Sequence, residues 1–200
     1  MTNAFLQTTY FGPVQWYQKL YRYDRCLIEQ YDSYQKQTYR NRCVIATANG
    51  LQALTVPVEH HSDSQFTKDL RISDHNQWRR VHWNALQSAY SESPFFDYYV
   101  DDIRPFFERK YDFLIDFNEA IRQKMCELID IHPKVEYTQE YQFSTFNDFR
   151  EIIHAKHPLS DADFVPQPYW QVFQQQYGFQ ANLSILDLLF CMGPEAVFYL

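Results

Sequence analysis

The chain has 200 residues and a formal net charge of −7, and 18% of its residues are aromatic. This length suits one domain, and no Gly/Ser-rich or charge-rich linker divides the chain, so we expect residues 1–200 to form a single domain. The acidic balance argues against nucleic acid as a partner, because phosphate binding needs a basic stripe. Only the segment 36–42 is locally basic, which is enough to hold one small anion.

The cysteines and the hydropathy pattern together indicate a cytoplasmic location. The four cysteines are far apart and form no CxxC motif, so we expect reduced, buried thiols. No apolar run approaches the roughly 18 residues that a membrane-spanning helix needs, and the N-terminus lacks a secretory signal pattern. We therefore expect no membrane span.

Common cofactor and metal motifs are absent from the sequence. With only four glycines the chain has no Walker A loop and no GxGxxG fingerprint, and it lacks GxSxG and HExxH motifs. The adjacent His60 and His61 could chelate a metal, but the spacing places no third ligand, so a plain surface loop is the better interpretation. The sequence predicts no metal site and leaves any cofactor unknown.

The opening of the chain predicts a strand–helix–strand unit. Residues 4–10 form a strand closed by Gly12-Pro13, residues 14–21 a helix, and residues 25–29 a second strand. Such a unit normally makes parallel strands with a right-handed crossover. The turn 11–13 lies at the carboxyl end of the first strand, beside a helix N-terminus, where open α/β sheets bind ligands. The alternative is a tight turn without a ligand.

A β-hairpin is predicted over residues 43–58. Asn49-Gly50 is a strong hairpin signal, because a type I′ turn needs φ > 0 at both central positions. Both strands are apolar on both faces, which is typical of strands covered on both sides. The polar, cationic segment 34–42 leads directly into the first strand. The predicted register pairs Ala48 with Leu51, Ala46 with Ala53, Ile45 with Leu54 and Val44 with Thr55.

Helices dominate the rest of the chain. Asp74, with Gln77 in a capping-box arrangement, starts a helix that runs to Ala89. Its residue His82 shares a face with Trp78, and it is either a hydrogen-bonded core histidine or an acid/base. The other expected elements are a strand over 68–73, a helix from 93 that breaks near Pro105, a helix over 112–129, a strand over 134–138, a short helix over 147–153, an extended segment over 161–168, a helix over 169–177 and an apolar helix capped by Ser184.

These elements predict an α/β fold with a mixed β-sheet, an N-terminal β-α-β unit, a central β-hairpin and packed helices. An α+β arrangement is the alternative. The C-terminal segment is too apolar to hang free, so we expect it to dock on the domain or on a second copy of the chain.

Three segments carry a resemblance: TYFGPVQWYQKL, IEQYDSYQKQTYRNRCVIATANG with the return strand LTVPV, and WRRVHWNALQSAYSESPFFDYY. Together they resemble the WbqC-like protein family, and DFLIDFN and NLSILDLLFCMGPEA are similar to its shorter Bacteroidetes-type members. Gly12 departs from the family pattern, which has a second proline there. The resemblance implies a context, surface-polysaccharide (O-antigen or capsule) biosynthesis, and no particular reaction. The pattern maps onto Tyr10, Pro13, Tyr39, Asn41, Arg42, Trp78, His82 and Tyr90.

The leading hypothesis is a transferase-type enzyme acting on an activated sugar or precursor that bears a phosphate or carboxylate. Arg42, with Lys36 or Arg40, would hold the anion, and His82 would be the catalytic acid/base. The substrate-binding residues would be Tyr10, Pro13, Lys36, Tyr39, Asn41, Arg42, Trp78 and Tyr90, with Trp83 as a further stacking surface.

Two other hypotheses stay open. The chain could be a non-catalytic ligand-binding or scaffolding subunit of a biosynthetic complex, as a homodimer through its C-terminal segment. The excess of Tyr and Trp and the lack of a complete catalytic motif favour that hypothesis. Alternatively, the Asn41, Arg42 and His82 set is structural, with Arg42 paired to a carboxylate such as Asp116.

Overall fold

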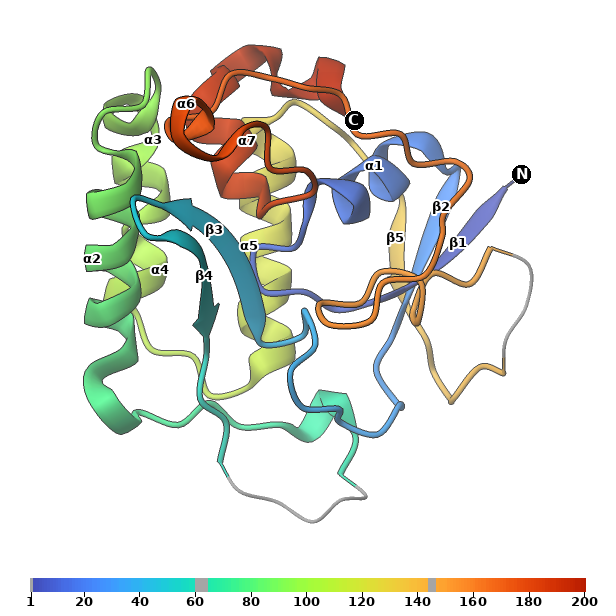
Figure 1. The fold of residues 1–200 in the computed structure, drawn as a ribbon. Coiled ribbons are helices and arrows are strands. Elements are labelled where there is room, and N and C mark those ends of the chain that lie inside the picture. Colours follow the sequence, from blue (N-terminus) through green and yellow to red (C-terminus); the bar gives the residue numbers. More distant parts are fainter. Residues whose placement is uncertain (1, 60–64, 144–146) are drawn as a thin grey trace.

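The computed structural model describes residues 2–59, 65–143 and 147–200 (Figure 1). The N-terminal unit has β1 (Asn3–Gln7), the helix α1 (Val14–Arg22) and β2 (Arg25–Glu29). β1 and β2 run parallel, and β5 (Val135–Tyr137) adds a third parallel strand beside β2. The predicted strand–helix–strand unit is therefore confirmed. The fold has the expected α/β or α+β character, with the parallel strands and the hairpin in two separate sheets.

The hairpin consists of β3 (Arg42–Thr47) and β4 (Gly50–Thr55), but its predicted register is wrong by two residues. The turn residues are Ala48 and Asn49, and Thr47 pairs with Gly50. The Thr47 hydroxyl accepts from the Asn49 amide and donates to the Gly50 carbonyl, and these two bonds stabilise the observed turn. Only Gly50 has positive φ there (97°), so the turn is not type I′.

The apolar sequence of the hairpin predicted that both of its faces are covered, and this prediction is also wrong. Cys43, Ile45 and Leu54 are buried, but the tip half of β4 is exposed at Leu51, Gln52 and Ala53. One face of the hairpin therefore packs on the core, and the outer part of β4 is open to solvent.

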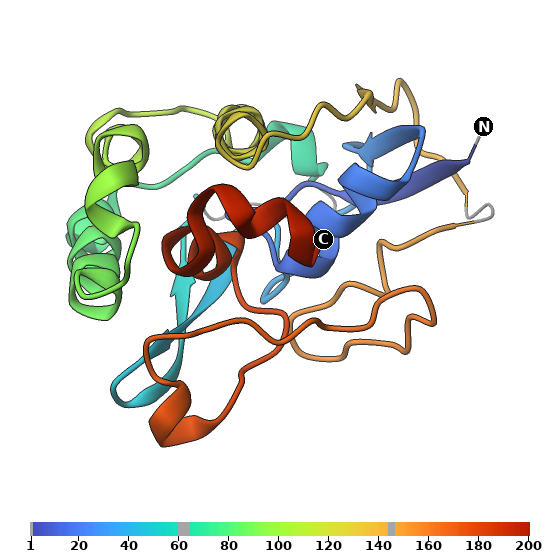
Figure 2. The same ribbon diagram turned by 90° about the horizontal axis from the view of Figure 1, so that it is seen from above.

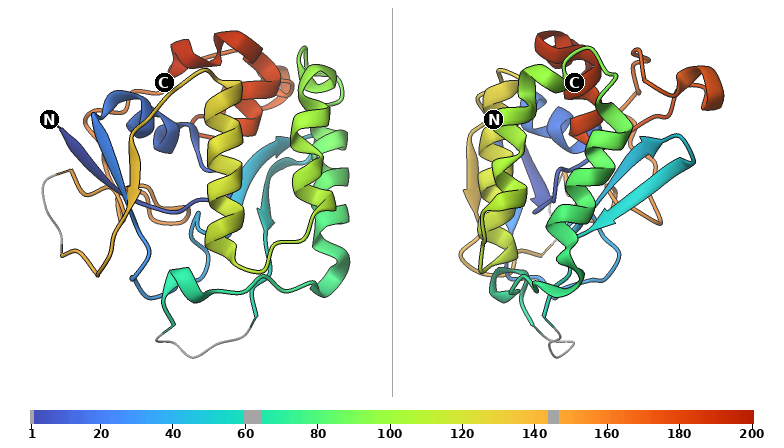
Figure 3. Two further views of the ribbon diagram at one scale, coloured as in Figure 1. Left: turned by 180° about the vertical axis from the view of Figure 1, so that it is seen from behind. Right: turned by 90° about the vertical axis from the view of Figure 1, so that its left-hand side faces the viewer.

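The helices are α2 (Trp78–Tyr90), α3 (Phe96–Ile103), α4 (Pro105–Glu108), α5 (Leu114–Leu128), α6 (Gln174–Tyr177) and α7 (Ile185–Met192). Short 3-10 turns lie at Thr67–Asp69, His75–Gln77 and Gly193–Tyr199. Figures 1 and 3 show α5 between the parallel sheet on one side and the hairpin with α2 on the other. The predicted break near Pro105 separates α3 from α4.

Four local predictions are wrong, each because tertiary contacts prevail over local pattern. Asp74 does not cap α2: its carboxylate binds Arg79 and Lys110, and Gln77 has positive φ (48°). Residues 68–73 form a 3-10 turn and isolated bridges, not a strand. Residues 147–153 form no helix because they pair with β1 at Phe5. In 169–177 only α6 is helical.

The apolar C-terminal helix docks on the domain, as expected. Ser184 caps α7 by accepting from the Leu186 amide, and its own amide donates to the Val44 carbonyl. α7 is buried almost throughout, and Figure 2 shows the C-terminal segment lying over the middle of the molecule. The four cysteines are free and buried, as predicted. In the described ranges, no helix has an apolar run long enough to cross a bilayer.

Candidate functional site

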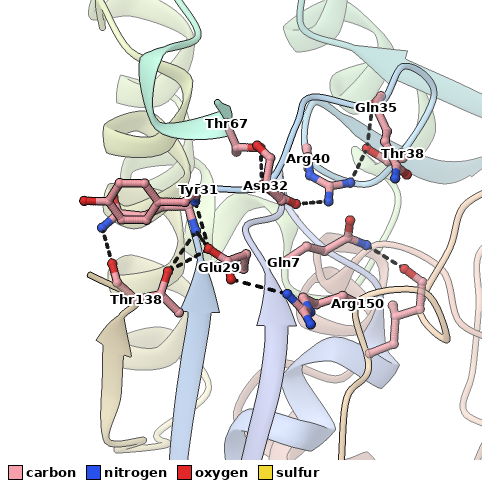
Figure 4. Close-up of polar contacts among 12 residues, drawn as sticks. Gln7, Glu29, Tyr31, Asp32, Gln35, Thr38, Arg40, Thr67, Thr138 and Arg150 are labelled. Carbon is pink, nitrogen blue, oxygen red and sulfur yellow. Dashed lines mark hydrogen bonds and ion pairs between the residues drawn. The ribbon is translucent and has the colours of Figure 1, made fainter. Parts of the chain in front are cut away.

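A polar residue lies at the carboxyl end of each parallel strand. Gln7 ends β1, Glu29 ends β2 beside it, and Thr138 follows β5. Because the strands are parallel, these three side chains meet at one edge of the sheet, where α/β proteins commonly bind ligands (Figure 4). The edge is therefore the first place to look for a site.

Glu29 is the centre of this edge. Its side chain is 0% exposed, yet every lone-pair direction has a donor. The Gln30 and Tyr31 amides and the Thr138 hydroxyl donate to Oε1, and the Gln142 amide donates to Oε2 at 2.9 Å. A buried carboxylate is tolerated only with such partners. Glu29 is thus a fixed anchor rather than a group free to react.

Arg150 connects Glu29 to the loop that begins at Asn147. Its Nη1 lies 3.3 Å from Glu29 Oε2, and its Nε and Nη2 bind the two Asp148 carboxylate oxygens at 2.9 and 2.6 Å. The Asp148 hydrogen bonds raise the pKa of Arg150 above its ordinary value. The guanidinium group also stands 5.5 Å from the centre of the Tyr141 ring. The guanidinium group of Arg150 is therefore held in one orientation and in its charged form beside an aromatic ring.

Arg40 forms the second buried ion pair, with Asp32. Its side chain is 2% exposed, and it also donates to the Thr38 hydroxyl at 3.2 Å. The Thr67 hydroxyl donates to the other Asp32 oxygen. Asn118 in α5 fixes the Arg40 backbone by donating to its carbonyl at 2.8 Å. Figure 4 shows Gln7 between the two arginines.

Two buried atoms of this network have no partner among the described residues. They are Nε of Arg40, a donor, and Oε1 of Gln7, an acceptor. Buried polar atoms are normally hydrogen-bonded, so this donor and this acceptor are two atoms of the network to which a further polar group could bind.

The network opens onto a cleft of about 730 Å³, here called the sheet-edge cleft. Its volume lies in the range of small-molecule sites. The lining of the cleft combines three aromatic side chains with polar and charged ones. Among the carboxylates that line it, only Glu151 has no hydrogen bond or ion pair to a described residue. The cleft is lined by Tyr31, Asp32, Ser33, Gln35, Arg40, Phe66, Tyr141, Asp148, Arg150, Glu151, Ile152 and Leu159.

Comparison with known proteins places these residues in a family context. A sequence model of the WbqC-like protein family matches residues 7–159. The chain belongs to the WbqC-like protein family. Every residue that lines the sheet-edge cleft falls inside the matched segment, whereas α6 and α7 lie beyond it.

One curated relative in Mycobacterium tuberculosis (strain ATCC 25618 / H37Rv), described as "Uncharacterized protein Rv1507c", is 26% identical over 205 residues. The alignment covers 88% of this chain and 87% of the relative, so the likeness extends beyond the segment that the family model matches. No solved structure matches the chain significantly.

The residues that the WbqC-like resemblance suggested form a different group. Tyr10, His82 and Trp78 do lie together: the Tyr10 hydroxyl is 2.9 Å from His82 Nδ1, and the Trp78 and His82 ring centres are 5.1 Å apart. His82 is 4% exposed and also hydrogen-bonds the backbone of Thr55. Burial lowers the pKa of His82 from 6.5 to about 4. The imidazole is therefore neutral near pH 7 and shielded from solvent, so its catalytic role stays a prediction.

The remaining predicted binding residues are dispersed and mostly buried. The Tyr90 hydroxyl binds the buried Asp187 carboxylate at 2.9 Å. Asn41 donates to the Val56 carbonyl across the start of the hairpin. Arg42 reaches the Thr55 hydroxyl at 3.2 Å, Pro13 bridges to Ser184, Tyr39 is buried, and Lys36 is exposed on the loop before Arg40.

The turn at 11–13 is occupied by the chain itself. The Val14 amide donates to the Leu183 carbonyl, and the Gln15 amide donates to Asn182 Oδ1 at 2.9 Å. The start of α1 is thus capped by the segment before α7, and the predicted ligand position there is filled by protein. The predicted loop with His60 and His61 lies outside the described residues. In the parts described, no group of three metal-ligating side chains occurs.

Sequence reasoning found Arg40 but missed its partner Asp32, and it missed Glu29 and Arg150 altogether. Glu29 and Arg150 are 121 residues apart, so no local spacing links them. One signal was present: Gln7 lies directly after the apolar run of the first predicted strand, and Glu29 ends the second predicted strand. Applied to Gln7 and Glu29, the rule for the carboxyl ends of parallel strands would have pointed to this edge.

Proposed function

We propose that the chain is a transferase-type enzyme that binds an activated sugar or polysaccharide precursor in the sheet-edge cleft. The observation that carries the proposal is the make-up of this cleft: two guanidinium groups fixed by buried carboxylates stand beside the aromatic rings of Tyr31, Phe66 and Tyr141. Sugar rings pack against aromatic faces, and arginine binds phosphate or carboxylate with two parallel hydrogen bonds. The polysaccharide context comes from the WbqC-like resemblance.

Each cleft residue has a distinct role in this proposal. Arg40 and Arg150 are each paired with carboxylates, so they hydrogen-bond the polar groups of the substrate through the N–H groups that those carboxylates leave free. Their fixed geometry reduces the entropy lost on binding. Tyr141, which is 46% exposed, stacks on the sugar. Glu151 is the proton-transfer group, because the other cleft carboxylates are held by arginines. The buried His82 hydrogen-bonds Tyr10 within the core, and its predicted role as the catalytic acid/base is the alternative to Glu151.

The first experiment is a thermal-shift screen against nucleotide sugars, sugar phosphates and amino acids. A ligand at 100 times its dissociation constant stabilises the fold by about 2.7 kcal/mol, which raises Tm by roughly 5–11 °C for a chain of this size. Tyr141→Ala removes an exposed ring from the cleft. Tyr98→Ala, at a 73% exposed tyrosine on α3 outside the cleft lining, is the matched control.

The expected result is a shift by one ligand class that is lost in Tyr141→Ala and kept in Tyr98→Ala. If both variants keep the ligand-induced shift in Tm, the binding site lies outside the sheet-edge cleft. With a ligand in hand, Glu151→Gln should abolish turnover and leave binding intact, whereas Glu92→Gln, at an exposed turn after α2, should leave both unchanged. Full turnover by Glu151→Gln would refute the role of Glu151.

A second candidate function is a non-catalytic ligand-binding or scaffolding subunit, with the C-terminal segment as a contact between copies. The observation that favours it is the Phe198 side chain, a large apolar group that is 78% exposed on the C-terminal 3-10 turn. Under this alternative a ligand binds the cleft with no turnover. Phe198→Ser would then lower the mass measured in solution, and an unchanged monomer before and after the substitution would argue against this contact.

A further inference from the structure

A second pocket is lined by residues of α2 and α4 and of the segments that precede them. These two helices lie on the far side of the molecule from the parallel sheet (Figure 1). Its volume is about 320 Å³, at the lower end of the range for small-molecule sites. It shares no lining residue with the sheet-edge cleft, and the proposed function makes no use of it. This α2–α4 pocket is lined by Gln77, Arg79, Arg80, Trp83, Arg104, Phe107 and Glu108.

The charge of the α2–α4 pocket is opposite to that of the chain. Three arginines line it against one glutamate, in a chain whose formal net charge is −7. Arg79 is committed, because it pairs with Asp74 and lies over the Trp78 ring. Arg80 and Arg104 are the available cations.

Arg80 is exposed and, among the described residues, has no hydrogen bond or ion pair. Arg104 contacts Glu108 through Nε alone, in a pair whose two side chains are both 57% exposed. Such exposed pairs are weak, so Arg104 can turn its terminal nitrogens to a ligand at little cost. Two guanidinium groups on neighbouring helices therefore face one pocket, an arrangement that fits a phosphate group.

The pocket also has a rigid aromatic wall. The Trp83 ring is half-buried, and its centre lies 5.6 Å from that of Phe107 and 6.1 Å from that of Phe96, onto which it is stacked. These contacts hold the indole in one orientation, so a second planar ring can stack on it without first ordering the side chain.

We propose that the α2–α4 pocket binds a mononucleotide, with the base against Trp83 and the phosphate between Arg80 and Arg104. Every nucleobase has a π-face that stacks on an aromatic side chain, and arginine binds phosphate with two hydrogen bonds. The volume fits one base with its sugar, not a dinucleotide. The site is separate from the sheet-edge cleft, so the mononucleotide is a second ligand and not the activated end of the cleft substrate.

The test is isothermal titration calorimetry of the full chain with a mononucleotide, its nucleoside and inorganic phosphate. Because Arg80 has no partner among the described residues, Arg80→Ala removes a charge without leaving a buried group unpaired. The matched control is Arg109→Ala, at an exposed arginine just after α4 that lines a different pocket. Tyr141→Ala separates this site from the sheet-edge cleft.

The expected result is binding of the mononucleotide that weakens about tenfold or more in Arg80→Ala and is unchanged in Arg109→Ala and Tyr141→Ala. Nucleoside and phosphate should each bind at least about tenfold more weakly than the nucleotide, since each lacks one of the two sets of contacts. No heat from any mononucleotide at millimolar concentration would overturn the proposal. So would equal losses in the two arginine variants, or phosphate binding as tightly as the nucleotide.

Discussion

Acidification should destabilise the fold through His82, and the size of the effect follows from its burial. The pKa of His82 is lowered from 6.5 to about 4 in the folded chain. Between pH 4 and pH 6.5 the unfolded chain therefore binds a proton at His82 that the folded chain does not bind. The contribution of His82 to the free energy of unfolding is complete above pH 6.5 and falls as the pH drops toward 4. At about 1.36 kcal/mol for each pH unit, the loss between pH 7 and pH 5 is about 2 kcal/mol. For a chain of this size that lowers Tm by roughly 4–8 °C.

The assay is thermal unfolding followed by circular dichroism at several pH values from 7 to 5, for the wild type and for His82→Asn. The asparagine carbonyl can still accept the Tyr10 hydrogen bond, so the variant removes the titrating ring and keeps the contact. The variant should be less stable at pH 7 but should lose less stability on acidification. Carboxylates such as Asp161, whose pKa is lowered, act equally in both proteins and cancel in the comparison. Parallel losses in the two proteins would refute a buried, neutral His82.

Three further predictions concern stability and can be read from urea unfolding. Glu29→Gln should lower the free energy of unfolding by about 3 kcal/mol or more, because it breaks a buried charge network. Glu136→Gln, in an exposed ion pair, should lower it by less than about 1 kcal/mol. Equal losses in the two variants would contradict the role of Glu29 as an anchor. Asn118→Ala should cost about 2 kcal/mol, since it leaves the Arg40 carbonyl unpaired, and no loss would mean that water replaces the amide. Gly193→Ala should destabilise by about 2 kcal/mol or more, because φ is 56° and a Cβ would lie 2.6 Å from the Phe95 ring. A neutral result there would mean that this ring can move aside.

The sequence predicts most of the elements because their signals are local. Pro13 at the start of α1, the apolar stripe of α5 and the Ser184 cap each depend on residues within one or two turns of helix. The hairpin was predicted for the same reason. Its register was not, because the choice between two adjacent turns depends on the Thr47 hydroxyl rather than on the Asn49-Gly50 dipeptide.

The candidate site was harder to predict because its contacts are long-range. The positive charge of the segment 36–42 predicted a binding site there. Arg40 does line the sheet-edge cleft, but Arg42 instead donates to the Thr55 hydroxyl within the hairpin. The cleft joins the ends of the parallel strands to the loop with Arg150, and only the sheet topology brings them together. Three of the predicted site residues make contacts inside the core: Tyr10 and His82 hydrogen-bond each other, and the Asn41 amide donates to the Val56 carbonyl.

The capping of α1 by the segment before α7 has a consequence for the order of synthesis. Leu183 and Asn182 hold the first amides of α1, and Ser184 binds the Phe11 carbonyl and the hairpin. Residues 147–149 pair with β1 as well. A chain that grows from its N-terminus therefore makes β1, α1 and the hairpin long before their partners exist. Final packing must wait until residues 182–184 have left the ribosome, and until then the early strands need protection from aggregation.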